Sequence, residues 1–196
     1  MQDDRKLRLF VGAEISIAAA RNLASAAEAM RALPAARALS LRWLAPASYH
    51  VTLKFLGWVR APTLTAIRDA VSEAAKTSAC APFMVRHQGL GAFPRDTAAR
   101  VLWAGVGDGA KSLETLAAAV DGALCDLGFA AETRPFHPHV TLARAKAPGD
   151  AREILATASE QVYSQSRVDA LIIYESHLKS TGSEYRVSAR LALPGR

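Results

Sequence analysis

The sequence is poor in the residues and motifs that several protein classes require. Only two cysteines occur among its 196 residues, Cys80 and Cys125, with no CxxC pair and no histidines spaced as metal ligands beside them. This spacing is typical of neither a zinc finger nor a disulfide framework, so we expect a chain that works in a reducing compartment. The motifs GxGxxG, GxxxxGK[ST] and HExxH are also missing, and nothing here favours a dinucleotide fold, a P-loop or a zinc protease.

Long apolar runs are absent as well. No window reaches the roughly 18 to 20 uninterrupted apolar residues of a transmembrane helix. Residues 1–20 have the cationic start of a signal peptide, but Asp3, Asp4 and Glu14 interrupt its basic and apolar regions. We therefore expect a cytoplasmic protein that is not integral to a membrane.

The composition is that of a folded chain with a sizeable core. Apolar residues make up 51% of the sequence and charged residues 21%, which excludes disordered and collagen-like proteins. No linker rich in Pro, Gly or Ser divides the chain, so we treat residues 1–196 as a single domain.

Positive charge is concentrated in two stretches. The formal net charge is +6, and residues 41–60 and 133–149 each hold three basic residues and no acid, which accounts for the whole excess. Chance clustering on solvated faces would give this pattern, and so would an anion site that the two stretches share.

Strands and helices follow one another without a regular βαβ alternation, a pattern that favours an α+β fold. Alternating or β-branched segments predict strands over 7–13, 41–44, 50–56, 82–88, 100–106, 139–143, 167–177 and 185–193. Apolar residues at helical spacing predict helices after Ser16, after Pro62, over 113–127 with a stop at Gly128, and near 151–159.

The tetrapeptide HVTL occurs twice, at residues 50–53 and 139–142, which suggests an internal duplication with one copy in each lobe. Both copies have the β-branched character of a strand. The period of two then places His50 with Thr52 on one face, and His139 with Thr141 on one face. If a pseudo-two-fold axis relates the lobes, these faces look at each other across a cleft.

Two such His/Thr pairs suit an in-line displacement at phosphorus. Because histidine titrates near pH 6.5, one imidazole can accept the proton of the attacking oxygen while the other protonates the leaving oxygen. The threonine hydroxyls can donate hydrogen bonds to the non-bridging oxygens as negative charge builds. This chemistry needs no metal, no cofactor and no covalent intermediate.

Other interpretations of these residues stay open. The histidines can be ordinary strand residues and the threonines can reflect β-propensity, although the duplication speaks against both. His137 and His139 alternate along the strand and so can ligate one metal ion, but no Asp or Glu follows within ten residues.

The flanks of the two motifs resemble those of the 2H phosphoesterase superfamily, and within it those of the RNA 2',3'-cyclic phosphodiesterases, historically called 2'-5' RNA ligases. The likeness runs almost end to end and rests on five stretches: RLFVGAEI, YHVTLKFLG, RVLWAGV, RPFHPHVTLAR and ESHLKSTGSEYRV. A lone HxT motif is common by chance, whereas two copies at this separation and in these flanks are a specific signal.

The resemblance implies a bilobal α+β fold, in which two antiparallel sheets face a central cleft and helices cover the outside. It implies that His50 donates a proton to the leaving 3' oxygen, that His139 accepts the proton of the attacking water, and that the product ends in a 2'-phosphate. Thr52 and Thr141 would hold the phosphate. The partner would be RNA with 2',3'-cyclic phosphate ends, tRNA fragments included, with no obligatory protein partner.

Three further residues are candidates for substrate binding. Arg144 matches the arginine that follows the family's second motif, but simple alternation places it opposite His139, so its role requires a bulge or the strand end. Lys54 shares the parity of His50 and can reach a phosphate, unless it is a solvated edge residue. Phe10, within the RLF match, either offers a ring for base stacking or belongs to the core.

The expected activity is hydrolysis of 2',3'-cyclic phosphate RNA ends, with nucleotide-independent 2'-5' joining as a reverse reaction. Two alternatives stay open. One is the same chemistry on a small cyclic nucleotide or an ADP-ribose cyclic phosphate, which dependence on substrate length would reveal. The other is a module that binds RNA ends without turnover, which predicts that a His50→Ala variant keeps its function.

Overall fold

The computed structural model describes residues 5–157, 161–179 and 182–195. Its strands, in chain order, are β1 (Lys6–Glu14), β2 (Arg42–Trp43), β3 (His50–Arg60), β4 (Phe83–Phe93), β5 (Ala99–Val106), β6 (His139–Gly149), β7 (Val162–Val168), β8 (Ala170–Lys179) and β9 (Gly182–Ala192). Its α-helices are α1 (Ile17–Arg31), α2 (Pro34–Ala38), α3 (Leu64–Thr77), α4 (Ala110–Cys125) and α5 (Arg152–Ala156). Three short 3-10 turns are η1 (Pro46–Ser48), η2 (Ala61–Thr63) and η3 (Asp96–Ala98).

The strands pair antiparallel in the order β7-β4-β5-β6-β3-β1-β8-β9, and the short β2 pairs with β6 beside this path. Among the described residues, β6 and β3 pair only where Val51 lies opposite Val140. The sheet therefore consists of two halves, β7-β4-β5-β6 and β3-β1-β8-β9, which meet at a narrow seam. The predicted α+β class with two antiparallel halves is confirmed, and the structure adds that the halves are continuous at this seam.

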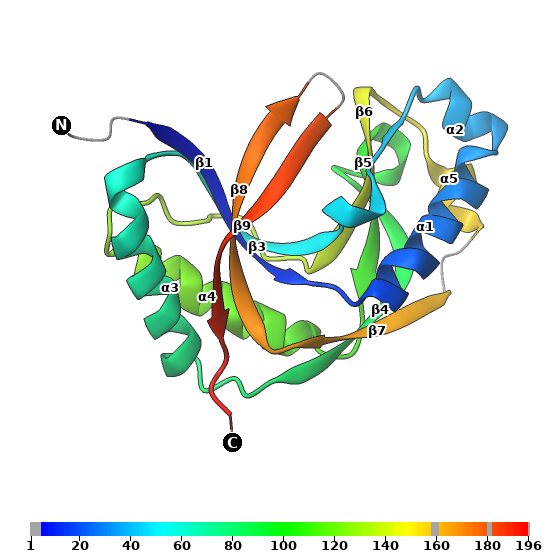
Figure 1. The fold of residues 1–196 in the computed structure, drawn as a ribbon. Coiled ribbons are helices and arrows are strands. Elements are labelled where there is room, and N and C mark those ends of the chain that lie inside the picture. Colours follow the sequence, from blue (N-terminus) through cyan, green and yellow to red (C-terminus); the bar gives the residue numbers. More distant parts are fainter. Residues whose placement is uncertain (1–4, 158–160, 180–181, 196) are drawn as a thin grey trace.

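The helices cover the outer side of the sheet, and two of them cross between the halves (Figure 1). α1 follows β1 in the sequence but lies against β7, whereas α4 follows β5 but packs against β3 and α3. From the seam outwards, β3, β1, β8 and β9 on one side correspond to β6, β5, β4 and β7 on the other. This mirrored order agrees with the pseudo-two-fold relation that the duplicated motif predicts.

The long helices bury the apolar stripes that their spacing predicts. On the side of each long helix that faces the sheet, the apolar residues are fully or nearly fully buried. These residues are Leu23, Ala27 and Met30 of α1, Ile67, Val71 and Ala75 of α3, and Leu113, Leu116, Val120 and Leu124 of α4. The side-chain oxygen of Ser16 caps α1 by accepting the N–H of Ala19 at 3.1 Å. No helix in the described ranges combines the length and apolar composition needed to cross a bilayer.

The end of α4 differs slightly from the prediction. The helix ends at Cys125, and Gly128, at φ 86°, takes the left-handed conformation that stops it. The amides of Gly128 and Phe129 donate to the carbonyls of Cys125 and Leu124. Leu127, expected on the buried stripe, lies in this turn and is exposed.

The single strand predicted over 167–177 is two strands in the structure. β7 ends at Val168 and pairs with β4, whereas β8 begins at Ala170 and pairs with β1 and β9. Asp169 is thus the point where the chain passes from one half to the other. The five-residue α2 is too short to show a helical period and was not predicted. The helix expected near 151–159 is α5, and residues 158–159 lie outside the described ranges.

Candidate active site

The two HVTL motifs begin the two strands that meet at the seam. β3 starts at His50 and β6 at His139, and the pair Val51–Val140 lies at the centre of the contact. In antiparallel register around this pair, position 50 lies across from 141 and position 52 across from 139, all on one face. Both valines are fully buried on the opposite face. The two histidines and the two threonines are therefore neighbours on the open side of the sheet.

The main chain two residues before each histidine orients its ring. Nδ1 of His50 lies 2.7 Å from the carbonyl oxygen of Ser48, and Nδ1 of His139 lies 2.7 Å from that of His137. Since a carbonyl oxygen only accepts, Nδ1 carries the proton in both rings, which leaves Nε2 to exchange a proton with a substrate. In the first motif, Nε2 of His50 lies 3.0 Å from Oγ1 of Thr52.

Aromatic rings enclose both imidazoles. The centroid of the His50 ring lies 4.7 Å from that of Phe10 and 5.0 Å from that of Tyr185, which it meets edge to face. The His139 ring meets Phe93 edge to face at 5.0 Å. These contacts restrict ring rotation and remove water from the imidazoles, so they affect both geometry and charge.

Both histidines have a lowered pKa. Burial is the main cause for His50, whose pKa falls to about 4, and the charges of His139 and Arg144 act in the same direction. Burial also lowers the pKa of His139, with smaller effects from His137 and Arg144. The hydrogen bonds from Nδ1 to the carbonyls oppose these shifts but are outweighed. Both rings are therefore neutral near pH 7 in the unliganded protein, and an anion beside them would favour protonation.

Two cavities adjoin on this face of the sheet. One, of about 480 Å³, is lined by His50, and the other, of about 610 Å³, is lined by His139. Thr52, Thr141 and Arg144 line both, as does Phe55. The site is thus a groove with one histidine on each side and the hydroxyls between them, a geometry suited to a phosphate at the centre.

A β-bulge in each central strand decides which residue after the motif faces the groove. In β3, Gly12 pairs with Thr52 and Val11 with Lys54, so Leu53 is an extra residue. In β6, the register of the pairs with β5 skips from position 141 to 143. Each bulge reverses the alternation and turns the fifth residue after the histidine toward the groove, Phe55 in one strand and Arg144 in the other. The bulge that the role of Arg144 requires is present.

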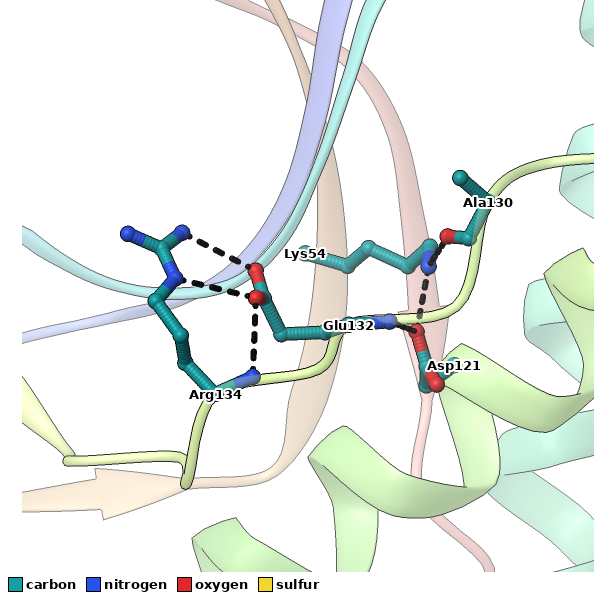
Figure 2. A network of polar contacts seen from close by, with 5 residues as sticks. All are labelled: Lys54, Asp121, Ala130, Glu132 and Arg134. Atoms are coloured by element: carbon teal, nitrogen blue, oxygen red, sulfur yellow. Dashed lines mark hydrogen bonds and ion pairs between the residues drawn. The ribbon is translucent and has the colours of Figure 1, made fainter.

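The predicted orientation of Lys54 is wrong for the same reason. The bulge takes Lys54 out of the alternation that His50 and Thr52 follow, although it still borders the 610 Å³ cavity. Its ammonium pairs with the Asp121 carboxylate of α4 and donates to the carbonyl of Ala130 at 2.7 Å (Figure 2). Asp121 also accepts the N–H of Glu132 at 3.2 Å, and Glu132 pairs with Arg134. With 7% of its surface exposed, Lys54 ties β3 to α4 and to the segment that leads to β6.

Phe10 belongs to a small apolar cluster beside the groove. It is 2% exposed, and its ring stacks on Tyr174 with centroids 4.9 Å apart. The centroid of the His50 ring lies 4.7 Å from that of Phe10 and 5.5 Å from that of Tyr174, so the three rings pack against one another and Phe10 restrains that imidazole. An exposed aromatic ring that does line the groove is Phe55. The sequence could have indicated it, because Phe55 follows His50 at the same distance at which Arg144 follows His139.

Three arginines line the 480 Å³ cavity, Arg8, Arg42 and Arg144, and the described residues around it include no acid. Arg42 of β2 lies directly across from Arg144 of β6. Burial lowers the pKa of Arg144, and the charges of Arg42 and Arg8 lower it further. Arg42 and Arg144 come from the two acid-free stretches of the sequence, whereas Arg8 lies outside both and no charge pattern indicated it. The structure thus brings one arginine from each of the two acid-free stretches to the same cavity, and the shared anion site expected from them stays a prediction.

The alternative of a metal site at His137 finds no supporting cluster. Among the described residues, no three His, Cys, Asp or Glu side chains are grouped so that they could hold an ion. The ring of His137 packs against Trp103, with centroids 4.6 Å apart, and its carbonyl accepts the Nδ1 proton of His139.

A family model described as the 2'-5' RNA ligase superfamily matches residues 16–179. The chain belongs to this superfamily. The chain is similar to the crystal structure of TT0787 from Thermus thermophilus, with a TM-score of 0.79 and 26% sequence identity. The alignment covers 96% of this chain and 99% of TT0787. The family resemblance of the sequence is confirmed.

Curated relatives extend the comparison. A protein of Aeropyrum pernix named RNA 2',3'-cyclic phosphodiesterase is 40% identical over 99 residues, which are 50% of this chain and 54% of that protein. A protein of the same name from Aquifex aeolicus is 31% identical over 157 residues, which are 79% of this chain and 82% of that protein. The chain thus spans about half the length of the first relative and most of the second.

Proposed function

We propose that this protein hydrolyses the 2',3'-cyclic phosphate at RNA ends and leaves a 2'-phosphate. The observation that carries the proposal is the seam, where one residue pair brings two identically oriented His/Thr pairs to one groove. The names of the relatives from A. pernix and A. aeolicus support the same substrate class.

The proposed reaction is an in-line displacement with one histidine on each side of phosphorus. Nε2 of His139 accepts a proton from water as the water oxygen bonds to phosphorus. The bond from phosphorus to the 3' oxygen breaks, and Nε2 of His50 gives its proton to that oxygen. One proton is taken up and one is released, so the pair returns to its starting charge after the two rings exchange a proton with solvent.

Hydrogen-bond donors between the histidines stabilise the phosphorane-like transition state. The hydroxyls of Thr52 and Thr141 lie between the two cavities and donate to the non-bridging oxygens. The guanidinium of Arg144 supplies a permanent charge at the same place. The exposed ring of Phe55 offers a face for a nucleobase. No metal, nucleotide or other cofactor takes part in this proposal.

In this proposal, binding of the substrate favours the protonated form of His50. A histidine with a pKa of about 4 is a poor acid reservoir at pH 7, because almost none of it is protonated. The phosphodiester carries one negative charge and approaches Nε2 of His50 directly, so its binding raises the pKa of that ring. His50 is thereby protonated when the phosphodiester is bound, and it then gives this proton to the leaving 3' oxygen.

Joining of RNA ends is a second reaction that one observation favours. The cavity on the His139 side, about 610 Å³, is far larger than a water molecule requires. A 5' hydroxyl of a second RNA can take the place of water there, and its attack would form a 2'-5' linkage without a nucleotide. The cyclic phosphate supplies the strain energy for that bond.

The test is incubation of the purified protein in excess EDTA with a short RNA that ends in a 2',3'-cyclic phosphate. His50→Ala and His139→Ala are compared with His177→Ala, which removes a histidine that pairs with Glu175 outside the two cavities. We expect a 2'-phosphate product, resolved from the 3'-phosphate by chromatography, that persists in EDTA and in His177→Ala. Each active-site variant should lose at least about 10²-fold in kcat. Turnover that EDTA abolishes, or that His50→Ala retains, contradicts the proposal.

A further inference from the structure

The 480 Å³ cavity contains more positive charge than one phosphate requires. Arg144 lies at the centre of the groove, but Arg42, one strand further out, also lines this cavity, as does Arg8. Neither the Arg42 nor the Arg144 side chain forms a hydrogen bond or an ion pair with another described residue. Within the described part of the chain, the Arg8 side chain donates only to the neutral Ser176, at 3.0 Å. Three guanidinium groups without a carboxylate among them repel one another, and an anion bound between them would offset this repulsion.

The direction of the proposed reaction places the RNA chain on this side. In an in-line displacement, the attacking water and the leaving 3' oxygen lie on opposite sides of phosphorus. His139 lines the 610 Å³ cavity, whereas His50, the proton donor to the 3' oxygen, lines the 480 Å³ cavity and also one of about 400 Å³ that Glu14 borders. Of the two cavities at His50, the 480 Å³ cavity, which has three arginines and no acid among the described residues that line it, suits a phosphate chain. The ribose of the terminal nucleotide, and whatever is attached to its 5' oxygen, therefore lies on the side of Arg8 and Arg42.

The cavity also continues in that direction. A neighbouring space of about 330 Å³ shares Arg42, Arg144 and Ser183 with it and extends between β2 and the β8–β9 hairpin. Glu184, whose carboxylate pairs with Lys179, also lines this space. Figure 1 shows this hairpin rising beside β6. A chain that leaves the centre past Arg144 thus passes Arg42 next.

We infer that Arg8 and Arg42 form a second anion subsite, which binds the phosphate on the 5' oxygen of the terminal nucleoside. This inference rests on the proposed function and deepens it, because a groove with this subsite recognises the RNA chain as well as the terminal cyclic phosphate. The shared chemistry is a phosphate at the 5' position, either the next phosphodiester of an RNA or the 5'-phosphate of a mononucleotide.

Three substrates separate these sources: a 2',3'-cyclic mononucleotide, its 5'-phosphorylated form, and a dinucleotide that ends in a 2',3'-cyclic phosphate. For the wild-type protein we expect kcat/KM to be roughly tenfold higher for the dinucleotide than for the mononucleotide, from one charge-assisted contact. If the 5'-phosphorylated mononucleotide gains as much, the anion alone is recognised. If only the dinucleotide gains, the subsite takes a phosphodiester of the RNA chain.

Arg42→Gln should remove most of this advantage, Arg42→Lys should retain part of it, and Arg8→Gln should reduce it. Arg68→Gln, on the exposed face of α3 away from these cavities, removes the same charge and should leave the advantage as in the wild type. A second readout is the salt dependence of kcat/KM for the dinucleotide, whose logarithmic slope should become shallower by about 0.7 in Arg42→Gln.

The outcomes distinguish this inference from the proposed function. If the wild type turns over none of the three substrates, the proposed function is wrong. If it turns over all three with equal kcat/KM, or if Arg42→Gln lowers all three by the same factor, the proposed function stands and the second subsite is wrong. Because Arg42 is exposed, its substitution does not disturb the core, and an unchanged thermal midpoint checks this.

Discussion

At the scale of single residues, the two halves of the groove are matched in orientation and unequal in charge. His50 and His139 bond to main-chain carbonyls in the same way, and each meets an aromatic edge at 5.0 Å. The fifth residue after each histidine differs, since Phe55 stands where the other strand has Arg144. At the equivalent position, one motif strand thus has an apolar ring and the other has a permanent positive charge. This difference allows the two histidines to act differently.

The lowered pKa values of the two histidines predict an acid-shifted activity. The pH dependence of kcat/KM reports the free enzyme, in which one ring must be protonated and the other neutral. Since both values lie below 6.5, the maximum of kcat/KM should lie below pH 6.5, and activity should fall as the pH rises from there. Initial rates at low substrate concentration across pH 4 to 9 measure this.

The imidazole signals of the two histidines in NMR spectra provide the control. In the unliganded protein the His50 ring should titrate near pH 4, and saturation with a 2'-nucleotide product should raise that pKa. A maximum of kcat/KM above pH 7, or a His50 pKa that the nucleotide leaves unchanged, would show that burial does not control the charge of this ring.

At the scale of elements, bulges and a buried ion pair determine how β3 and β6 present their side chains. The bulge at Leu53 directs Lys54 to α4 and Phe55 to the groove. The ion pair of Lys54 with Asp121 then holds the segment after α4, through the carbonyl of Ala130. The strand that begins with His50 is thereby linked to the segment that leads to His139.

Lys54→Met should lower the free energy of unfolding by about 1 to 3 kcal/mol, because it leaves Asp121 and the carbonyl of Ala130 without their charged donor. Urea unfolding measures this loss. Lys76→Met, which removes an exposed lysine paired with Glu73, is the matched control and should change stability by less than about 0.5 kcal/mol. A loss in Lys54→Met no larger than that of the control would mean that the network in Figure 2 contributes nothing to stability.

At the scale of the whole molecule, the seam makes one functional unit from two half-sheets. The helices α1 and α4 cross it in opposite directions, and the apolar residues of both halves form one continuous core. His87, on β4, is fully buried in this arrangement and contacts Oγ of Ser166 on β7 at 2.8 Å. Burial lowers its pKa to about 4, as it does for His50. Stability is therefore coupled to histidine protonation in both halves.

Acidification from pH 6.5 to 4.5 should destabilise the fold before its carboxylates are protonated. A histidine with a folded pKa of about 4 and an unfolded value of 6.5 binds protons first in the unfolded state, so its contribution is complete above pH 6.5 and is lost as the pH falls. The expected loss is roughly 2 kcal/mol for each such histidine. Urea unfolding at several pH values in buffers without phosphate measures it.

The matched variants are His50→Gln and His177→Gln. The first removes one buried titrating ring and should make the loss of stability with falling pH smaller, whereas the second changes a partly exposed ring and should leave it unchanged. Equal unfolding free energies at pH 6.5 and 4.5 in the wild type would contradict the prediction.

The sequence by itself determined which residues are proposed to carry the chemistry and most of the elements that hold them. The repeated HVTL motif, the period of two and the helical stripes led to His50, Thr52, His139 and Thr141 and to an α+β fold, because these patterns express local backbone geometry. The end of α4 followed from Gly128 in the same way, since a left-handed residue is a local requirement.

Only the tertiary structure decided what depends on strand partners. Register fixes the seam at Val51 and Val140, the bulge that takes Lys54 out of the alternation of His50 and Thr52, and the change of partner at Asp169 that divides one predicted strand into two. Pairing joins segments far apart in the sequence, so no local pattern records it. The meeting of Arg42 with the groove is of the same kind, because its neighbour across the strands is about one hundred positions away.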